Sequence, residues 1–227
     1  MIKYILIDFD NTLLDFDKAS SEILKSVFED NGFIYNKEMH AKFLEVNDDF
    51  WNAHEEGKIT VEYIRQNRFK VFFEKIGVKI NNNVDVEQIF RNGVSKSLIK
   101  IDGADEILRY LSDKYQVYIV SNGVAFTQYN RIEKTGWNKY FSGIFLSEEV
   151  GFQKPFKEFF NYCFEKIGSF DKEDYIIIGD SINSDIQGGN NVGIKTCLFN
   201  KKQISEFPKE TNFNYKVNNL LEIKNIL

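Results

Sequence analysis

The stretch IKYILIDFDNT occupies residues 2–12 and decides the fold. Its first seven residues, 2–8, form a largely apolar run, which acidic and small polar residues end abruptly. Such a run is typical of a strand buried on both faces of a parallel sheet. Similar runs recur at 117–120 (VYIV), 144–146 (IFL), 175–178 (YIII) and 194–199 (IKTCLF). The sequence therefore predicts a parallel sheet that includes the run at 2–8.

Helical patterns lie between these apolar runs. Residues 104–114 place Ile107, Leu108 and Leu111 on one helical face, and residues 156–167 show a similar apolar face. Strands that alternate with helices form parallel sheets with helices on both faces. We therefore predict an α/β fold with a doubly wound parallel sheet.

The stretch 17–97 differs, because helical spacing dominates it. Asn36 and Thr60 can cap the starts of two helices there, and Gly77 can end one of them. A further helix is expected over 86–97. We therefore predict a core domain made of 1–16 and 98–227, with 17–97 inserted into it as an α-helical domain.

The composition restricts the class of partner. The chain has 227 residues, with 34 acidic and 29 basic side chains and a formal net charge of −5. Nucleic-acid polymers and anionic membranes need a basic face, so we expect neither as a partner. We expect a small-molecule substrate, and a monomer or a homodimer.

The cysteines and the apolar run at 2–8 bear on the cellular compartment. Cys163 and Cys197 match neither a metal-ligand spacing nor a disulfide framework, and we expect them as buried thiols in a reducing compartment. The run at 2–8 is too short for a signal-peptide core or a membrane span. These observations predict a cytoplasmic protein.

Small polar groups of residues follow four of the apolar runs. They are Asp8-Phe9-Asp10-Asn11-Thr12, Ser121-Asn122-Gly123, Lys154-Pro155 (a short loop after its run) and the segment from Gly179 to Asp185. Each alone is typical of a turn, a helix cap or a solvated side chain. In an open parallel sheet, however, ligands bind beyond the carboxyl ends of the strands. The four groups, each behind a strand, therefore predict one shared site.

Charge indicates what this site would bind. Asp8, Asp180 and Asp185 would bring three carboxylates together, and without a cation they would repel one another. Hard oxygen ligands of this kind suit Mg²⁺, so we predict Mg²⁺ as the cofactor. The metal and Lys154 would together offset the carboxylates and attract a phosphate dianion.

The same arrangement predicts a phosphoryl transfer. Asp8, kept ionised, can attack phosphorus and form an aspartyl phosphate. Asp10 starts on the same strand face and can protonate the leaving alkoxide, then deprotonate the attacking water. Ser121, with Asn122 and Gly123, can hold the phosphoryl oxygens. The predicted reaction is the hydrolysis of a phosphate monoester.

These residues match the motifs of a known family. The sequence resembles the haloacid dehalogenase (HAD) superfamily of phosphatases over its whole length. The matching positions are Asp8, Asp10 and Thr12 in the first motif, Ser121 in the second, Lys154 in the third, and Gly179, Asp180 and Asp185 in the fourth. Asn11 stands where many members have glycine, and Asn also tolerates tight turns.

The resemblance implies a Rossmann-like core, with the helices of 17–97 as a cap that closes over the substrate. It implies Asp8 as the nucleophile and Asp10 as the acid/base. It also implies Mg²⁺ bound by Asp8, the Asp10 carbonyl and Asp180, with Asp185 at the metal or just behind it.

A narrower set of residues is similar to a group of pyrimidine 5′-nucleotidases. The set comprises Asn47, Trp51 and residues within 57–60, 65–69, 121–123, 131–136 and 147–151. Trp51 could stack on a base, and Asn47 could hydrogen-bond a base edge. Trp51 could equally pack inside the inserted domain, since Met39, Phe43 and Phe50 are near it in helical spacing. The resemblance favours nucleoside 5′-monophosphates, and pyrimidines among them, as substrates.

Other functions remain open at the level of sequence. A sugar phosphate or phosphoglycolate could be the substrate, because the inserted domain sets that choice. A dehalogenase would normally lack Asp10, and a phosphomutase would usually have Val in place of Thr12, so both are disfavoured. A non-catalytic phosphate-binding module would be free to lose a carboxylate or the lysine, and this chain has kept them all.

Overall fold

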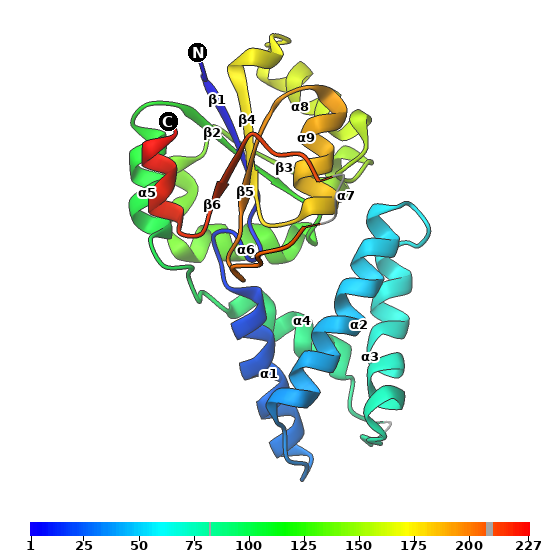
Figure 1. The fold of residues 1–227 in the computed structure, drawn as a ribbon. Helices are drawn as coiled ribbons and strands as arrows, with labels where there is room; N and C mark the ends of the chain where they lie inside the picture. The colour runs from blue at the N-terminus through cyan, green and yellow to red at the C-terminus, as the bar shows by residue number, and fades with distance from the viewer. Residues whose placement is uncertain (82, 208–210) are drawn as a thin grey trace. The chain divides into compact units, whose positions relative to one another are not determined.

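The computed structural model describes residues 1–81, 83–207 and 211–227, which divide into two compact units. The core unit consists of Met1–Asp15 and Lys100–Leu227, and the helical unit consists of Phe16–Ile99. In Figure 1 the core unit carries every labelled strand, whereas the helical unit contains α1 to α4.

The core unit is built on a parallel sheet. Within the described residues its strands are β1 (Tyr4–Ile7), β2 (Gln116–Ser121), β3 (Gly143–Leu146), β4 (Tyr175–Gly179), β5 (Lys195–Phe199) and β6 (Tyr215–Val217). Their order is β3-β2-β1-β4-β5-β6, and every neighbouring pair is parallel. Ile5 of β1 lies between Val117 of β2 and Ile176 of β4. The predicted doubly wound parallel sheet is therefore confirmed.

Helices cover both faces of the sheet. Successive residues of a strand point to opposite faces, so neighbouring residues of β1 pack against different helices. Ile5 and Ile7 pack in one cluster with Leu108 and Ile132, whereas Leu6 belongs to a second cluster with Phe160. The helices of this unit are α5 (Ala104–Ser112), α6 (Ala125–Thr135), α7 (Ser147–Val150), α8 (Lys157–Ile167) and α9 (Gln187–Val192). Short turns of helix are η1 (Trp137–Tyr140), η2 (Lys172–Asp174), η3 (Ile182–Ile186) and η4 (Leu220–Asn225).

Two helices of the helical unit begin directly after the capping residues that the sequence predicts, and one of them ends at the predicted glycine. Its helices are α1 (Phe16–Asp30), α2 (Lys37–Glu55), α3 (Val61–Ile76) and α4 (Val86–Lys96). The Asn36 side chain accepts a hydrogen bond from the Met39 N–H at 2.9 Å, and Thr60 caps α3 in the same way. Gly77 ends α3 with φ of 68°, a left-handed conformation that suits glycine. Phenylalanines fill the interior of this unit: Phe28, Phe43, Phe69, Phe72 and Phe90.

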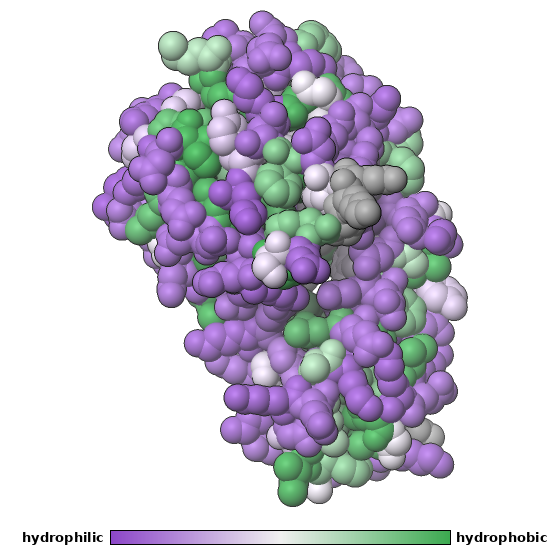
Figure 2. Space-filling view, viewed as in Figure 1, coloured by the Kyte–Doolittle hydropathy of each residue, from purple (hydrophilic) through white to green (hydrophobic). Residues whose placement is uncertain are grey.

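The surface agrees with the high content of charged residues. On the face shown in Figure 2, hydrophilic residues predominate and hydrophobic ones are scattered among them. Among the described residues, no helix is both long enough and apolar enough to cross a lipid bilayer.

Candidate active site

The strand order brings the first and fourth polar groups together. β1 and β4 are neighbours, and they stand where the winding of the sheet changes direction. Ligands of open α/β sheets bind at this switch point, beyond the carboxyl ends of the strands. Asp8 directly follows β1, and its N–H donates to the Ile178 carbonyl of β4 at 2.9 Å. Asp180 directly follows β4.

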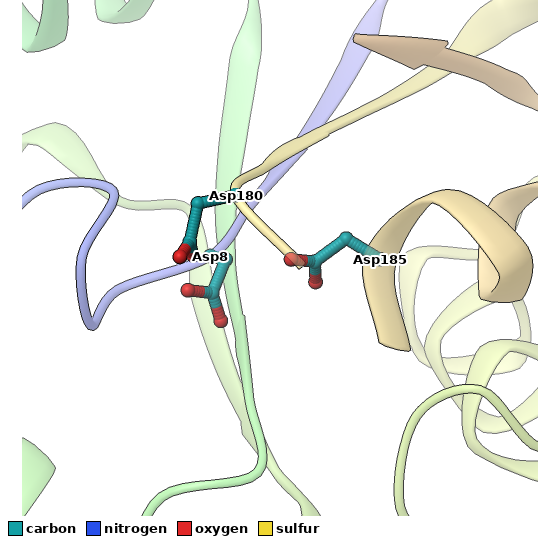
Figure 3. A group of neighbouring side chains, drawn as sticks. All are labelled: Asp8, Asp180 and Asp185. Atoms are coloured by element: carbon teal, nitrogen blue, oxygen red, sulfur yellow. The ribbon is translucent and has the colours of Figure 1, made fainter. Parts of the chain in front are cut away.

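Three carboxylates meet at this point. Asp8, Asp180 and Asp185 each offer an oxygen, and these oxygens all lie within 4.8 Å of one another. Figure 3 shows the three side chains directed toward a common region. Burial raises the pKa of Asp8 to about 7, because the pull of Lys154 in the other direction is countered by the negative charge of Asp185. Burial, together with Asp8 and Asp185, also holds the pKa of Asp180 well above its usual range.

Lys154 is the cation that this cluster contains. Its Nζ donates to Asp8 Oδ1 at 2.7 Å, to Asp185 Oδ1 at 2.6 Å and to the Val120 carbonyl at 2.8 Å, which uses all three N–H hydrogens. Burial alone would lower the pKa of Lys154, but Asp185 and Asp8 outweigh it and raise that pKa above its usual value. One positive charge thus faces three carboxylates.

Asp185 is held at the back of the cluster, fully buried. Its Oδ1 accepts from Lys154, and its Oδ2 accepts from the Ser181 N–H at 3.1 Å. Gly179 leaves the space that this carboxylate needs, since a Cβ at position 179 would lie 2.1 Å from Asp185 Oδ2. The glycine and the second aspartate of the fourth motif therefore depend on each other sterically.

The turn after β1 is tight. Asn11 has φ of 57°, a left-handed conformation that glycine adopts most easily and that Asn also tolerates. The neighbouring Thr12 is fully buried, and its hydroxyl donates to Asp180 Oδ1 at 3.2 Å. The turn thereby links the first motif to the fourth.

Asp10 belongs to a second set of contacts, apart from the three clustered carboxylates. Arg131 of α6 donates from Nη1 to Asp10 Oδ1 at 2.7 Å and from Nη2 to Asp10 Oδ2 at 3.0 Å. Gln128, also on α6, donates to Asp10 Oδ2 at 2.8 Å and to Ser121 Oγ at 2.7 Å. Gln128 and Arg131 also contact each other, the Gln128 carbonyl oxygen accepting from Arg131.

Within the Ser121-Asn122-Gly123 group, Asn122 and Ser121 make different kinds of contact. The side chain of Asn122 donates to the Lys154 carbonyl and accepts from the Lys154 N–H, both at 2.9 Å. Asn122 therefore fixes the backbone that carries the lysine. Ser121 Oγ accepts from Gln128 and, at 3.1 Å, from the Gly123 N–H, so its own proton can be directed at a ligand.

Two further candidates, Asn47 and Trp51, lie on α2 in the helical unit. Asn47 is buried, and its amide oxygen accepts from Arg68 Nη1 at 2.8 Å. Arg68 also makes a two-pronged contact with the Glu87 carboxylate, at 3.0 and 2.9 Å. Trp51 is half-buried and packs edge-on against His54, with ring centroids 5.7 Å apart. A base contact by either residue stays a prediction.

Gln128 is absent from the residues that the sequence predicts for this site, and Arg131 enters them only through a resemblance. Both are buried on α6, with neighbours such as Thr127 and Glu133 that are partly or fully exposed. The signal that could have found them is their spacing of three residues, which places both on one face of a helix that follows Ser121.

The sheet has this strand order, acidic side chains at its switch point and a buried lysine between them. The chain belongs to the haloacid dehalogenase-like hydrolases, whose family model matches residues 5–199. The chain is 38% identical over 223 residues to YfnB of Bacillus subtilis, named as a HAD-hydrolase, covering 98% of this chain and 94% of YfnB. A crystal structure of YfnB, described as bound to magnesium, has a TM-score of 0.90 and 36% identity, covering 100% of this chain and 98% of the other.

Two relatives carry the name of an activity. The pyrimidine 5′-nucleotidase YjjG of Escherichia coli is 30% identical over 224 residues, which cover 99% of this chain and 97% of YjjG. The pyrimidine 5′-nucleotidase PynA of Streptococcus pneumoniae is 31% identical over 199 residues, which cover 87% of this chain and 84% of PynA. The recognised family is therefore confirmed.

Proposed function

We propose that the protein is a Mg²⁺-dependent phosphomonoesterase that acts through an aspartyl phosphate on Asp8 and prefers pyrimidine nucleoside 5′-monophosphates. The observation that carries this proposal is the cluster of Asp8, Asp180 and Asp185 around a single lysine at the switch point of the sheet. A family of hydrolases that contains nucleotidase relatives supports the choice of reaction.

The donor set fits Mg²⁺. Carboxylate oxygens are hard ligands, and Mg²⁺ is commonly held by a few of them together with water. Asp8, Asp180 and the Asp10 carbonyl would hold the ion, with Asp185 at the metal or just behind it. When bound, the metal supplies positive charge that favours the ionised carboxylates and neutralises a phosphate group. The raised pKa values of Asp8 and Asp180 are what crowded carboxylates show when no metal charge offsets them.

The first half-reaction follows from the positions of the chain's own groups. Lys154 holds the Asp8 carboxylate at 2.7 Å, which fixes its direction. A bond forms from an Asp8 oxygen to phosphorus while the ester P–O bond breaks, and Asp10 gives a proton to the departing alkoxide. Ser121 donates its hydroxyl hydrogen to a phosphoryl oxygen.

The second half-reaction restores the enzyme. Asp10, now a carboxylate, accepts a proton from water as the water oxygen attacks the phosphorus of the aspartyl phosphate. The bond between phosphorus and the Asp8 oxygen breaks, and inorganic phosphate leaves. The net reaction consumes one water and yields an alcohol and phosphate.

The helical unit is the natural place for substrate selection, and we propose that it serves as a cap. The relatives named as pyrimidine 5′-nucleotidases match across both units, which supports a nucleoside monophosphate as the substrate. In this proposal Trp51, which is half-buried, stacks on the base.

A substrate panel with and without Mg²⁺ tests the proposal. UMP, dTMP, AMP, glucose 6-phosphate, phosphoglycolate and p-nitrophenyl phosphate are compared by kcat/KM for the purified protein. We expect cleavage that EDTA stops and Mg²⁺ restores, with UMP and dTMP preferred. A preference for phosphoglycolate or sugar phosphates would overturn the substrate assignment, and activity that EDTA does not affect would overturn the metal assignment.

The nucleophile has its own test. Asp8→Asn should abolish turnover of p-nitrophenyl phosphate, because an amide oxygen cannot take the phosphoryl group. Asp174→Asn is the matched control: Asp174 is also a buried aspartate paired with a lysine, at 2.6 Å to Lys3, but it lies before β4 rather than after it. Near-normal activity in Asp8→Asn would refute the nucleophile.

A further inference from the structure

The carboxylate of Asp10 is anchored by two buried residues that no motif of the predicted site includes. Arg131 is 2% exposed and Gln128 is fully buried, whereas the Asp10 side chain is 30% exposed. The Arg131 guanidinium also lies over the Phe9 ring, 5.1 Å from its centroid. A buried and packed arginine has little freedom to move, so the carboxylate that it holds is fixed as well.

The hydrogen bonds on Asp10 can be counted. A carboxylate has about four lone-pair positions. Arg131 occupies one on each oxygen, and Gln128 occupies the second on Oδ2. Counted over the described residues, the remaining position is on Oδ1, and the Asp10 side chain is exposed enough for a ligand to reach it. A proton carried by Asp10 would therefore sit on Oδ1, in one direction.

Gln128 links this carboxylate to the phosphate-holding hydroxyl. Its amide nitrogen gives one hydrogen to Asp10 Oδ2 and the other to Ser121 Oγ, while its oxygen accepts from Arg131. All of its polar atoms are used, and this fixes the orientation of the amide. A Cβ at Gly123 would lie 2.1 Å from the Gln128 nitrogen, so the glycine leaves room for this bridge.

We infer that Arg131 and Gln128 are positioning residues, which aim the Asp10 carboxyl group at the leaving oxygen and keep it in register with Ser121. The inference rests on the proposed function, in which Asp10 is the acid and base. In this proposal neither residue bonds to phosphorus or transfers the proton itself. Arg131 acts through Asp10, whereas Gln128 acts through Asp10 and Ser121 together.

The leaving group provides the decisive test. An alkoxide needs a proton to depart, whereas p-nitrophenolate leaves without one. The parameter kcat/KM reports the step that forms the aspartyl phosphate, so it isolates the acid role from the later base role. Arg131→Met and Gln128→Met are compared with the unchanged protein on UMP, an alkyl ester, and on p-nitrophenyl phosphate, both with saturating Mg²⁺.

General acid catalysis is worth about 10²–10⁴-fold, so misaiming the acid in Arg131→Met should lower kcat/KM for UMP by roughly 10²-fold. The same variant should lower kcat/KM for p-nitrophenyl phosphate by no more than about threefold. Arg131→Lys, which keeps the charge and one donor to Asp10, should recover part of the loss. If Arg131→Met does not fold, Arg131→Lys and Gln128→Met still report the same ratio between the two esters.

A double variant checks that the effect passes through Asp10. Asp10→Asn should show the same dependence on the leaving group, and adding Arg131→Met to it should cost little more on UMP. Two controls on α6 are Ile132→Val, a core change, and Tyr129→Phe, which removes an exposed contact with Glu149. Both should leave the ratio between the esters unchanged.

The outcomes separate this inference from the proposed function. Equal losses on UMP and p-nitrophenyl phosphate in Arg131→Met, or full additivity with Asp10→Asn, overturn the positioning role alone. A wild-type protein that is inert toward both esters with Mg²⁺ overturns the proposed function, and the inference falls with it.

Discussion

Replacing Lys154 with methionine removes the charge on which the acidic cluster depends. The Lys154 Nζ makes hydrogen bonds of 2.6–2.8 Å to Asp185, Asp8 and the Val120 carbonyl, and its side chain is 1% exposed. Methionine fills much of the same aliphatic space without a charge or a donor. The variant therefore leaves two carboxylates and a carbonyl without their common partner.

The expected cost follows from this burial. Removing one member of a buried ion pair destabilises a protein by about 3–5 kcal/mol. For a chain of this size, 1 kcal/mol shifts Tm by about 2–4 °C, so Lys154→Met should unfold roughly 6–20 °C earlier in EDTA. Saturating Mg²⁺ should recover part of this loss, since it returns positive charge to the cluster.

The stability that Lys154→Met loses should also depend on pH, and the pKa of Asp8 gives the direction of this dependence. The pKa of Asp8 is about 7 in the folded protein, against about 3.9 for an unfolded aspartate. Between these values the folded state binds the extra proton, so metal-free stability falls as pH rises. Without Lys154 the pKa of Asp8 rises further, and the gap between variant and wild type should be wider at pH 8 than at pH 6.

Thermal unfolding followed by circular dichroism in EDTA measures both effects. Lys3→Met is the control, because Lys3 pairs with the buried Asp174 at 2.6 Å but its own side chain is 62% exposed, so water can reach the Asp174 carboxylate once the lysine is gone. A partly exposed pair stabilises less than a fully buried one, so this variant should lose less Tm than Lys154→Met. If Lys154→Met lost no more stability than Lys3→Met, the description of the cluster as dependent on one cation would be refuted.

Two further predictions concern the same cluster. Mg²⁺ must displace the proton from Asp8, so calorimetry should find an affinity that falls by up to about tenfold per pH unit below 7; an affinity that is equal at pH 6 and pH 8 would contradict the raised pKa. Asn122→Ala breaks both hydrogen bonds with the Lys154 backbone, each 2.9 Å long. This variant should lower the free energy of unfolding by about 2–4 kcal/mol and should lower kcat at least severalfold. Wild-type values of both quantities would exclude a positioning role for Asn122.

Much of the fold could be predicted because its signals are local. The five predicted apolar runs became strands, since a strand buried on both faces needs apolar residues at successive positions. The caps at Asn36 and Thr60 and the end at Gly77 also act within a few residues. β6 (Tyr215–Val217) was not predicted, because two of its three residues are exposed and it is defined only by pairing with β5.

The candidate site was less predictable wherever a contact joins distant segments. The sequence indicated Asn122 as a phosphate ligand, but nothing in it shows that the side chain would meet the Lys154 backbone, 32 residues later. Gln128 resembles an ordinary polar residue of a surface helix until the fold brings it to Asp10. Polar residues with two or three long-range partners therefore need coordinates to be recognised.

The absence of a side chain at Gly179 restricts which substitutions this site can accept during evolution. The volume that an alanine methyl would fill is already taken by the Asp185 carboxylate, at 2.1 Å. Any enlargement at 179 must therefore be matched by a shorter residue at 185. A shorter residue at 185 would in turn remove the carboxylate that Lys154 and the Ser181 N–H bind, so a larger residue at 179 can be accommodated only with loss of these contacts.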